Sequence, residues 1–148
     1  MKRSNSAGIP KQVSAAKAIA AHQRFSGALP ISQMPRLAEQ LADREGGLAV
    51  DLEAARDASG SWLTGEIRGE LNLTCQRGLH PFGWSCALTP RLRLVASEAE
   101  EQRVLKDCDP YLVQDDQLPL RELVEDEVLL ALPLVPRCDD PDCVKRLK

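Results

Sequence analysis

A long stretch of alternating apolar and polar residues in the middle of the chain constrains the fold most. Between residues 48 and 94, three segments alternate with a period of two and are separated by residues typical of turns. A period of two places successive side chains on opposite faces of a strand, so each segment predicts a strand with one apolar and one polar face. One solvated face is typical of antiparallel pairing. The pattern therefore predicts an antiparallel β-meander.

Every second residue of each segment belongs to the apolar face of the predicted sheet. Asp57-Ala58-Ser59-Gly60 is the turn between the first segment and the second. Gly65 and Gly69 fall on the apolar face of the second segment, where a missing side chain indicates a bulge or the close approach of another element. The expected apolar positions are Leu48, Val50, Leu52, Leu63, Ile67, Leu71, Leu73, Cys75, Trp84, Cys86, Leu88, Leu92 and Leu94.

Two helical segments are expected before the meander. Ser14 is a candidate N-cap for an alanine-rich helix that runs through Ala21. Residues 26–30 contain glycine and proline and are expected to break the chain. Ser32 is a candidate cap for a second helix, which the pair Gly46-Gly47 ends.

Two further helical segments are expected after the meander. Ser97 and Glu100 match a capping box, which predicts a short polar helix from Glu98 to about Lys106. The turn-rich connection that follows has at most a short extended piece at residues 111–113. A final helix, ended by Pro133, is expected to cover the sheet. Its apolar stripe consists of Leu120, Leu123, Val124, Val128 and Ala131.

Length and composition are those of one soluble domain. The chain has 148 residues, of which 43% are hydrophobic and 28% are charged. We expect a single α+β domain over residues 13–136, an antiparallel β-meander packed on one face by helices. Residues 1–12 have no periodicity and are expected to be a flexible arm, and residues 137–148 a tail that carries a cysteine pair.

Net charge and hydropathy exclude some classes of protein. The net charge is -3, which argues against a broad cationic surface that coats RNA. A local basic patch remains compatible with this charge. The sequence has no stretch apolar enough to span a membrane and no apolar signal core, so we expect a cytoplasmic protein.

Two motifs resemble a known family. Residues 124–136, VEDEVLLALPLVP, are similar to the signature of the YceD family, in which an acidic helix leads into an apolar stretch and a proline-bounded exit. Residues 73–77, LTCQR, resemble the family's strand-end motif. The order of segments agrees from about Val13 onward. The resemblance implies a cytoplasmic protein that promotes synthesis, processing or stability of 23S ribosomal RNA, without known catalytic activity.

The resemblance also raises the question of zinc, because family members commonly carry a Cys-x-x-Cys knuckle and a C-terminal pair of Cys or His. Cys75 keeps the first knuckle position, but Gly78 stands at the second. Cys138 and Cys143 form the distant pair, and His80 is the remaining candidate for a fourth ligand. Because one knuckle cysteine is missing, we expect no bound metal or other cofactor. A structural zinc module is the alternative.

Two polar surfaces are candidate binding sites, and each also has an ordinary structural explanation. Arginines near an aromatic ring can hold phosphates and stack bases, although charge pairing across strands explains arginines on a sheet equally well. These residues are Arg68, Arg77, Arg91, Arg93 and Trp84. An acidic cluster on the final helix suits a basic ribosomal or RNA-processing protein, or is a solvated face. Its members are Glu122, Glu125, Asp126 and Glu127.

The residues contain no set that predicts catalysis. A metal-dependent nuclease needs converging carboxylates from separate elements, and the acidic cluster has no such counterpart. A thiol nucleophile needs a histidine and an orienting acid, and neither His22 nor His80 lies in a motif of this kind. We therefore predict a non-enzymatic ribosome-biogenesis factor that binds a protein or RNA component of the large-subunit precursor. The alternative is a metal- or thiol-dependent RNA-processing enzyme.

Overall fold

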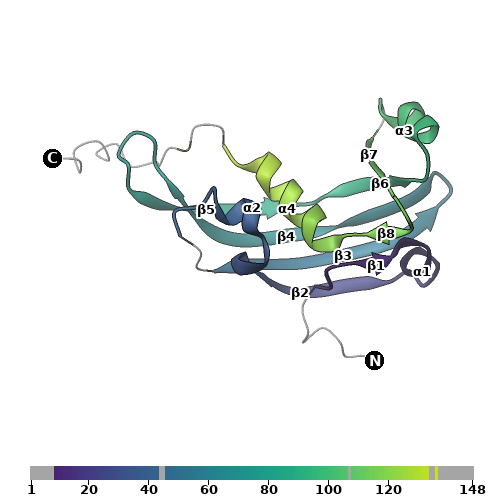
Figure 1. Cartoon of the computed structure of the whole chain (residues 1–148), viewed down its shortest axis with the longest axis horizontal. Helices are drawn as coiled ribbons and strands as arrows, with labels where there is room; N and C mark the ends of the chain where they lie inside the picture. Colours follow the sequence, from purple (N-terminus) through teal and green to yellow (C-terminus); the bar gives the residue numbers. More distant parts are fainter. Residues whose placement is uncertain (1–8, 44–45, 107, 134–135, 137–148) are drawn as a thin grey trace.

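A mixed sheet with helices on one face is seen in the computed structural model, which describes residues 9–43, 46–106, 108–133 and 136 (Figure 1). In this part of the chain the main sheet has the strand order β2-β3-β4-β6-β7, and β5 also pairs with β4. Its strands are β2 (Arg24–Pro30), β3 (Gly47–Asp57), β4 (Gly60–Thr74), β5 (Pro81–Leu88), β6 (Arg91–Val95) and β7 (Asp109–Leu112). Two short strands, β1 (Val13–Ser14) and β8 (Gln117–Leu118), pair with each other.

The hairpin of β3 and β4 is the longest part of the sheet and follows the predicted pattern. The turn begins at Asp57, whose Oδ1 accepts hydrogen bonds from the backbone N–H groups of Ser59 (2.8 Å) and Gly60 (3.2 Å). Gly60 has a φ of 141°, which favours glycine. A side chain at Gly65 would overlap the carbonyl oxygen of Asp51, so the expected close approach is confirmed.

The third alternating segment forms two strands instead of one. Both pair antiparallel with β4, β6 with its residues 61–64 and β5 with its residues 67–74. Thr89-Pro90 separates them, because proline has no N–H for the ladder. The carbonyl oxygen of Pro90 accepts a hydrogen bond from Gly65 N (3.2 Å), which closes the gap. The prediction of one continuous third strand was therefore wrong.

Two strands of the sheet were not predicted. β2 pairs antiparallel with β3 at the sheet edge, and Phe25 and Leu29 are buried on its inner face. Gly27 lies between them, so the alternation was hidden, and Pro30 is tolerated because the strand is at the edge. β7 pairs parallel with β6, and it replaces the short extended piece expected at residues 111–113. The strands are otherwise antiparallel in the described part of the chain, so the expected mixture of helices and mostly antiparallel strands is confirmed.

Sequence patterns located the helices well, with one exception. Ser14 caps α1 (Ala15–Ala20), and Ser97 caps α3 (Glu98–Val104). α4 (Leu120–Ala131) ends just before Pro133. The second helix is much shorter than expected: Ser32 does not cap it but lies in a 3-10 turn, η2 (Ile31–Gln33), and α2 covers only Pro35–Ala38.

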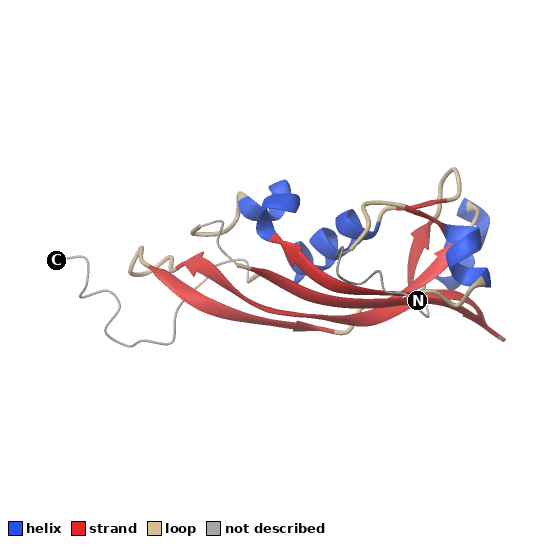
Figure 2. Ribbon diagram, turned by 90° about the horizontal axis from the view of Figure 1, so that it is seen from below, coloured by secondary structure: helices blue, strands red, loops and turns tan. Residues whose placement is uncertain are grey.

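The helices lie on the same side of the long strands, and the core fills the space between (Figure 2). α4 covers the middle of the sheet (Figure 1), and its Leu123 and Val124 line the same small cavity as residues of β3, β4 and β6. Ile9 is 1% exposed, and its carbonyl oxygen accepts a hydrogen bond from Arg121 Nε (2.9 Å). Ile9 therefore belongs to the core and not to a flexible arm. Residues 1–8 of the predicted arm and the tail 137–148 lie outside the described residues.

Among the helices of the described residues, none has the length and apolar character that crossing a membrane requires.

Candidate functional site

Three arginines of the predicted surface, Arg68, Arg91 and Arg93, lie on the face of the sheet that the helices leave uncovered. Strand register places Arg93 directly opposite Trp62, and Arg91 opposite Thr64. Directly opposed residues of an antiparallel pair share a face, and this face is opposite to that of the buried Leu63. Arg68 lies on the same face, four residues further along β4. The period-two pattern therefore placed Arg68, Arg91 and Arg93 correctly on one face.

Arg91 and Arg93 both contact the ring of Trp62, and we call these three residues the Trp62 stack. The Arg91 Cζ atom lies 4.1 Å from the ring centroid and the Arg93 Cζ atom 5.6 Å from it. The indole N–H donates to Ser59 Oγ (2.9 Å) and Asp57 Oδ1 (3.2 Å), which fixes the ring. Cations over an indole face are favourable because the ring quadrupole is negative there. The Trp62 ring is therefore a fixed platform on which the two guanidinium groups lie.

The two arginines of the stack differ in what they present to solvent. The Arg93 side chain is only 14% exposed, and its Nη2 lies 3.7 Å from the Glu100 carboxylate. Its Nε atom is buried without a hydrogen-bond partner among the described residues. Arg91 is exposed and forms no ion pair with a described carboxylate. Arg91 is therefore the member of the stack that can reach an anion in solvent.

The other predicted members of the arginine surface are used differently. Arg68 Nη2 lies 2.9 Å from Glu66 Oε2, so its charge is paired on the surface. Arg77 lies in the turn after β4. Ten residues of this strand separate Thr64, which is opposite Arg91, from the strand end at Thr74, and at ~3.3 Å per residue this is about 33 Å. The structure therefore does not bring Arg77 to the stack.

Trp84 is a correction to the predicted surface. It lies opposite Leu71 on the face that the helices cover, where it is half-buried and packs against the core. Its phase in the alternating pattern matches this inner position. The aromatic residue on the arginine face is Trp62, which the sequence-based prediction missed although its phase, opposite to that of Leu63, could have identified it.

Glu125 of the predicted acidic surface is a structural residue. It is 4% exposed, and its carboxylate accepts hydrogen bonds from the backbone N–H groups of Arg36 (2.8 Å) and Leu37 (3.0 Å). The other carboxylate oxygen accepts from Arg36 Nε (3.2 Å) and Nη2 (3.0 Å). Glu125 therefore caps the first turn of α2, because Met34 at the N-cap has no side-chain oxygen. The prediction of Glu125 as a partner-binding residue was wrong.

The remaining acidic residues of α4 form a reduced surface. Asp126 Oδ1 lies 2.8 Å from Arg36 Nη2, so this carboxylate is paired within the molecule. Glu122 is exposed. Burial raises the pKa of Glu127, and the nearby charges of Asp109 and Asp126 raise it further. Asp109, at the start of β7, thus adds to an acidic area that its distance in the sequence concealed.

The turn after β4 bears on the zinc alternative. Cys75 is buried, its Sγ accepts a hydrogen bond from Gly78 N (3.4 Å), and its backbone N–H donates to the carbonyl oxygen of His80 (2.9 Å). His80 Nδ1 lies 3.2 Å from the carbonyl oxygen of Pro81. Gly78 offers no ligand atom, so the described residues supply at most two of four zinc ligands and do not by themselves fit the site.

The other two candidate ligands, Cys138 and Cys143, lie outside the described residues. Within the described ranges, no three His, Cys, Asp or Glu side chains group closely enough to hold a metal ion. Pro136, the last described residue, returns to this turn, where its carbonyl oxygen accepts a hydrogen bond from Gln76 N (2.8 Å). A zinc site that includes the tail stays a prediction.

Comparison with known proteins gives one family. Residues 63–147 match the family model described as large ribosomal RNA subunit accumulation protein YceD, and this range is more than half of the chain. The chain belongs to the YceD family. The resemblance seen in the sequence is thereby confirmed, and the name of the YceD family links the chain to accumulation of large-subunit ribosomal RNA. No solved structure matches the chain.

The range that matches the YceD family begins within β4 and contains two arginines of the Trp62 stack and the acidic helix α4. The segments before β4 lie outside it. Arg91, Arg93 and all of α4 lie inside it, whereas Trp62 lies one residue before it. Arg36, which holds Glu125, lies well before it. The matched part of the chain thus depends on earlier residues in two places. Arg36 anchors its acidic helix, and Trp62 supplies the ring under Arg91.

Proposed function

We propose that this YceD-family protein is a non-enzymatic factor that acts in the cytoplasm and supports accumulation of 23S ribosomal RNA by binding the large-subunit precursor. We further propose that it contacts ribosomal RNA through the Trp62 stack. Membership of the family supports the link to large-subunit RNA. The observation that supports the RNA contact is the exposed guanidinium of Arg91, 4.1 Å from the Trp62 ring centroid and outside any ion pair with a described carboxylate.

The chemistry of the stack suits a phosphate next to an unpaired base. A guanidinium presents a planar fork of N–H donors that matches two phosphate oxygens. Because the Trp62 ring already holds one face of Arg91, less side-chain entropy is lost on binding. The outward face of the guanidinium is left for a base, and stacking of this kind is typical of contacts to single-stranded RNA.

The charges around the stack predict a small contact. On the same face of the sheet, Arg24 pairs with Asp51 and Arg68 pairs with Glu66, so both arginines are neutralised. A face with paired charges releases few counterions when RNA binds. We therefore expect contact with one or two phosphates, and a correspondingly shallow dependence of the affinity on salt concentration.

A protein partner on the acidic surface is the competing interpretation. That surface has lost Glu125 to the core, and Asp126 is paired with Arg36. What remains exposed is Glu122, with Glu127 half-buried. Because two of the four predicted carboxylates are used within the molecule, the geometry favours the RNA contact.

The test compares two arginines of the same sheet face. Arg91→Glu is expected to weaken binding of 23S ribosomal RNA fragments at fixed salt by about tenfold or more, as loss of a stacking and phosphate contact does. Arg68→Ala, whose charge is already paired with Glu66, is the control and should change the affinity by less than about twofold. In cells that depend on the variant, Arg91→Glu should lower the ratio of 23S to 16S ribosomal RNA.

A pull-down with and without RNase separates the two kinds of partner. If the captured large-subunit components disappear on RNase treatment and are lost with Arg91→Glu, the RNA contact is supported. Partners that survive RNase and are lost with Glu122→Ala and Glu127→Ala would place the function on the acidic surface and contradict the proposal.

Absence of turnover is tested separately. Purified protein incubated with precursor 23S ribosomal RNA and Mg²⁺ should leave the RNA intact over many hours. Cleavage that tracks the protein through purification would show that the enzyme alternative is correct.

A further inference from the structure

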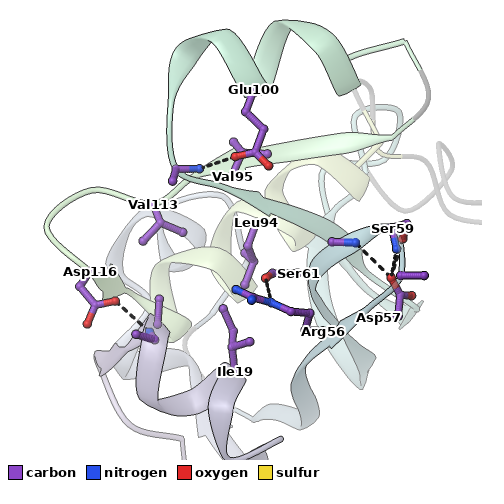
Figure 3. A pocket seen from close by; sticks show the side chains of 15 residues that line it. Ile19, Arg56, Asp57, Ser59, Ser61, Leu94, Val95, Glu100, Val113 and Asp116 are labelled. Carbon is purple, nitrogen blue, oxygen red and sulfur yellow. Dashed lines mark hydrogen bonds between the residues drawn. The ribbon is translucent and has the colours of Figure 1, made fainter.

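A pocket of about 450 Å³ lies at one end of the sheet, on the face that the helices cover (Figure 3). It is bounded by α1, by the tip of the β3–β4 hairpin, by the end of β6 and by Glu100 of α3. The volume is within the range of small-ligand sites. Part of its wall is apolar, and this part is formed by Ile19, Leu94, Val95 and Val113. The pocket shares Asp57, Ser59 and Glu100 with the support of the Trp62 stack, but Trp62, Arg91 and Arg93 do not line it.

The side chain of Arg56 enters the pocket from the end of β3, between Ile19 and Leu94 (Figure 3). Its Nε donates a hydrogen bond to Ser61 Oγ (3.3 Å). The terminal guanidinium nitrogens have no described acceptor, and no described carboxylate forms an ion pair with Arg56. A second hollow, lined by Ala16, Ile19 and Ala20, borders the same side chain. The cation is thus accessible from the pocket.

Asp57 lines the pocket beside Arg56, but its Oδ1 atom is occupied by its own turn. Its Oδ1 accepts from Ser59 N (2.8 Å), Ser59 Oγ (2.6 Å), Gly60 N (3.2 Å) and Trp62 Nε1 (3.2 Å). These hydrogen bonds, first among them the one from the Ser59 hydroxyl, lower the pKa of Asp57. Asp57 is therefore held in the hairpin turn through Oδ1, and it forms no ion pair with Arg56 among the described residues.

The other two carboxylates of the pocket also have partners of their own. Glu100 Oε1 accepts from Ala96 N (3.0 Å), and its Oε2 lies 3.7 Å from Arg93 Nη2. Asp116 Oδ1 accepts from Ala16 N (2.8 Å) at the start of α1. Each carboxylate is thus held by a group other than Arg56. The guanidinium of Arg56 remains as the polar group of this pocket that lacks an opposite charge.

We propose that the pocket binds a single carboxylate attached to a short aliphatic group. Arg56 holds the carboxylate through its terminal N–H groups, with the Ser61 hydroxyl beside it, and Ile19, Leu94 and Val113 contact the aliphatic part. A guanidinium binds a carboxylate with two parallel hydrogen bonds, and apolar walls add affinity by removing the aliphatic group from water.

The lining also selects against phosphate and nucleic acid. Asp57, Glu100 and Asp116 also line the pocket, and their negative charge repels a dianion or a polyanionic backbone more strongly than it repels a single carboxylate. The same chemistry is offered by a free branched carboxylic acid and by the C-terminal residue of a polypeptide that ends in leucine or valine.

Binding of two carboxylate probes tests the proposal and separates these sources. The probes are 4-methylpentanoate and an acetylated tripeptide that ends in leucine with a free C-terminus. Their controls are 4-methylpentanamide, the same peptide with an amidated C-terminus, and inorganic phosphate. For ligands of this size a Kd on the order of 1 mM is expected, which NMR titration of the backbone amides measures.

At least one carboxylate probe should shift the amide signals of Ile19, Ser61 and Val113 saturably, and the amides and phosphate should not. The tighter probe identifies the source. Arg56→Gln should weaken binding about tenfold or more, whereas Arg24→Gln, outside the pocket, should leave it unchanged.

A second variant tests the pocket without removing the positive charge of Arg56. Ala16 lines the pocket and is exposed on α1, so Ala16→Trp fills the space without disturbing the core and should also prevent binding. Thermal melts confirm that both variants are folded. The proposal is overturned if neither carboxylate probe binds, if the amides or phosphate bind equally well, or if Arg56→Gln and Ala16→Trp bind as the parent protein does.

Discussion

Two arginine sites in this molecule, the α2–α4 junction and the Trp62 stack, have opposite relations to solvent. At the junction, Arg36 is 52% exposed, yet its guanidinium is bound to Glu125 and Asp126, and its backbone N–H is bound to Glu125 as well. In the stack, Arg91 is exposed too, but it lies against the ring of Trp62 and has no carboxylate partner among the described residues. One arginine completes the fold, and the other is left available.

The comparison teaches that exposure and charge do not identify a binding surface by themselves. The acidic helix carries the family signature and was expected to bind a partner, yet its central carboxylate is buried and holds another helix. The group that a guanidinium already contacts indicates better whether it can bind a ligand. A guanidinium that already has carboxylate partners has little left for a ligand, whereas one held by an aromatic face keeps its hydrogen-bond donors free.

The largest effect is expected for Glu125→Ala. The variant leaves two backbone N–H groups of α2 without an acceptor and removes the two hydrogen bonds that the Arg36 side chain donates to Glu125. The free energy of unfolding should therefore fall by about 3 kcal/mol. Urea unfolding followed by circular dichroism measures it. Glu122→Ala, on the exposed side of the same helix, is the control and should change stability by less than about 0.5 kcal/mol. Equal effects of the two variants would show that Glu125 does not cap α2.

A smaller effect should separate the two arginines directly. Arg36→Ala removes the cation from the junction but leaves Glu125 with the two backbone donors, so we expect a loss of about 1–2 kcal/mol. Arg91→Ala removes an exposed contact with Trp62 and should cost less than about 1 kcal/mol. Parallel urea titrations test this order. An Arg91→Ala loss as large as that of Arg36→Ala would mean that the stack serves the fold and not a ligand.

The smallest effect concerns the surface pair of Arg24 and Asp51, which lies on the same sheet face as the stack. Arg24 lowers the pKa of Asp51 through its hydrogen bonds. A lowered pKa in the folded state stabilises the fold above the unfolded pKa, and this contribution is lost as the pH falls through the folded pKa. Asp51→Asn should therefore lower the urea midpoint slightly at neutral pH, and the difference should shrink below about pH 4. A difference that stays constant into strong acid would rule out this origin.

Local patterns were sufficient for much of the fold because they are properties of neighbouring residues. The alternation of Leu48, Val50 and Leu52 with polar residues specified β3, and Ser14 and Pro133 marked ends of helices that the structure contains. The strand β2 was missed because Gly27 interrupts its alternation and because it pairs with β3 residues that lie 17 to 29 positions later in the chain. The break between β5 and β6 was hidden because Pro90 lies between apolar positions of equal phase.

In the candidate site, too, some features follow from local sequence and others only from tertiary contacts. The chain itself determined that Arg91 and Arg93 share a face, because the period of a strand fixes this locally. Folding then decided that Trp62 lies beneath them, since strand register is set by the pairing of β4 with β6. It also decided that Glu125 is buried, because the helix end that it caps lies 89 residues earlier in the chain. Sequence periodicity tells which face a side chain occupies, but only tertiary contact determines what it meets there.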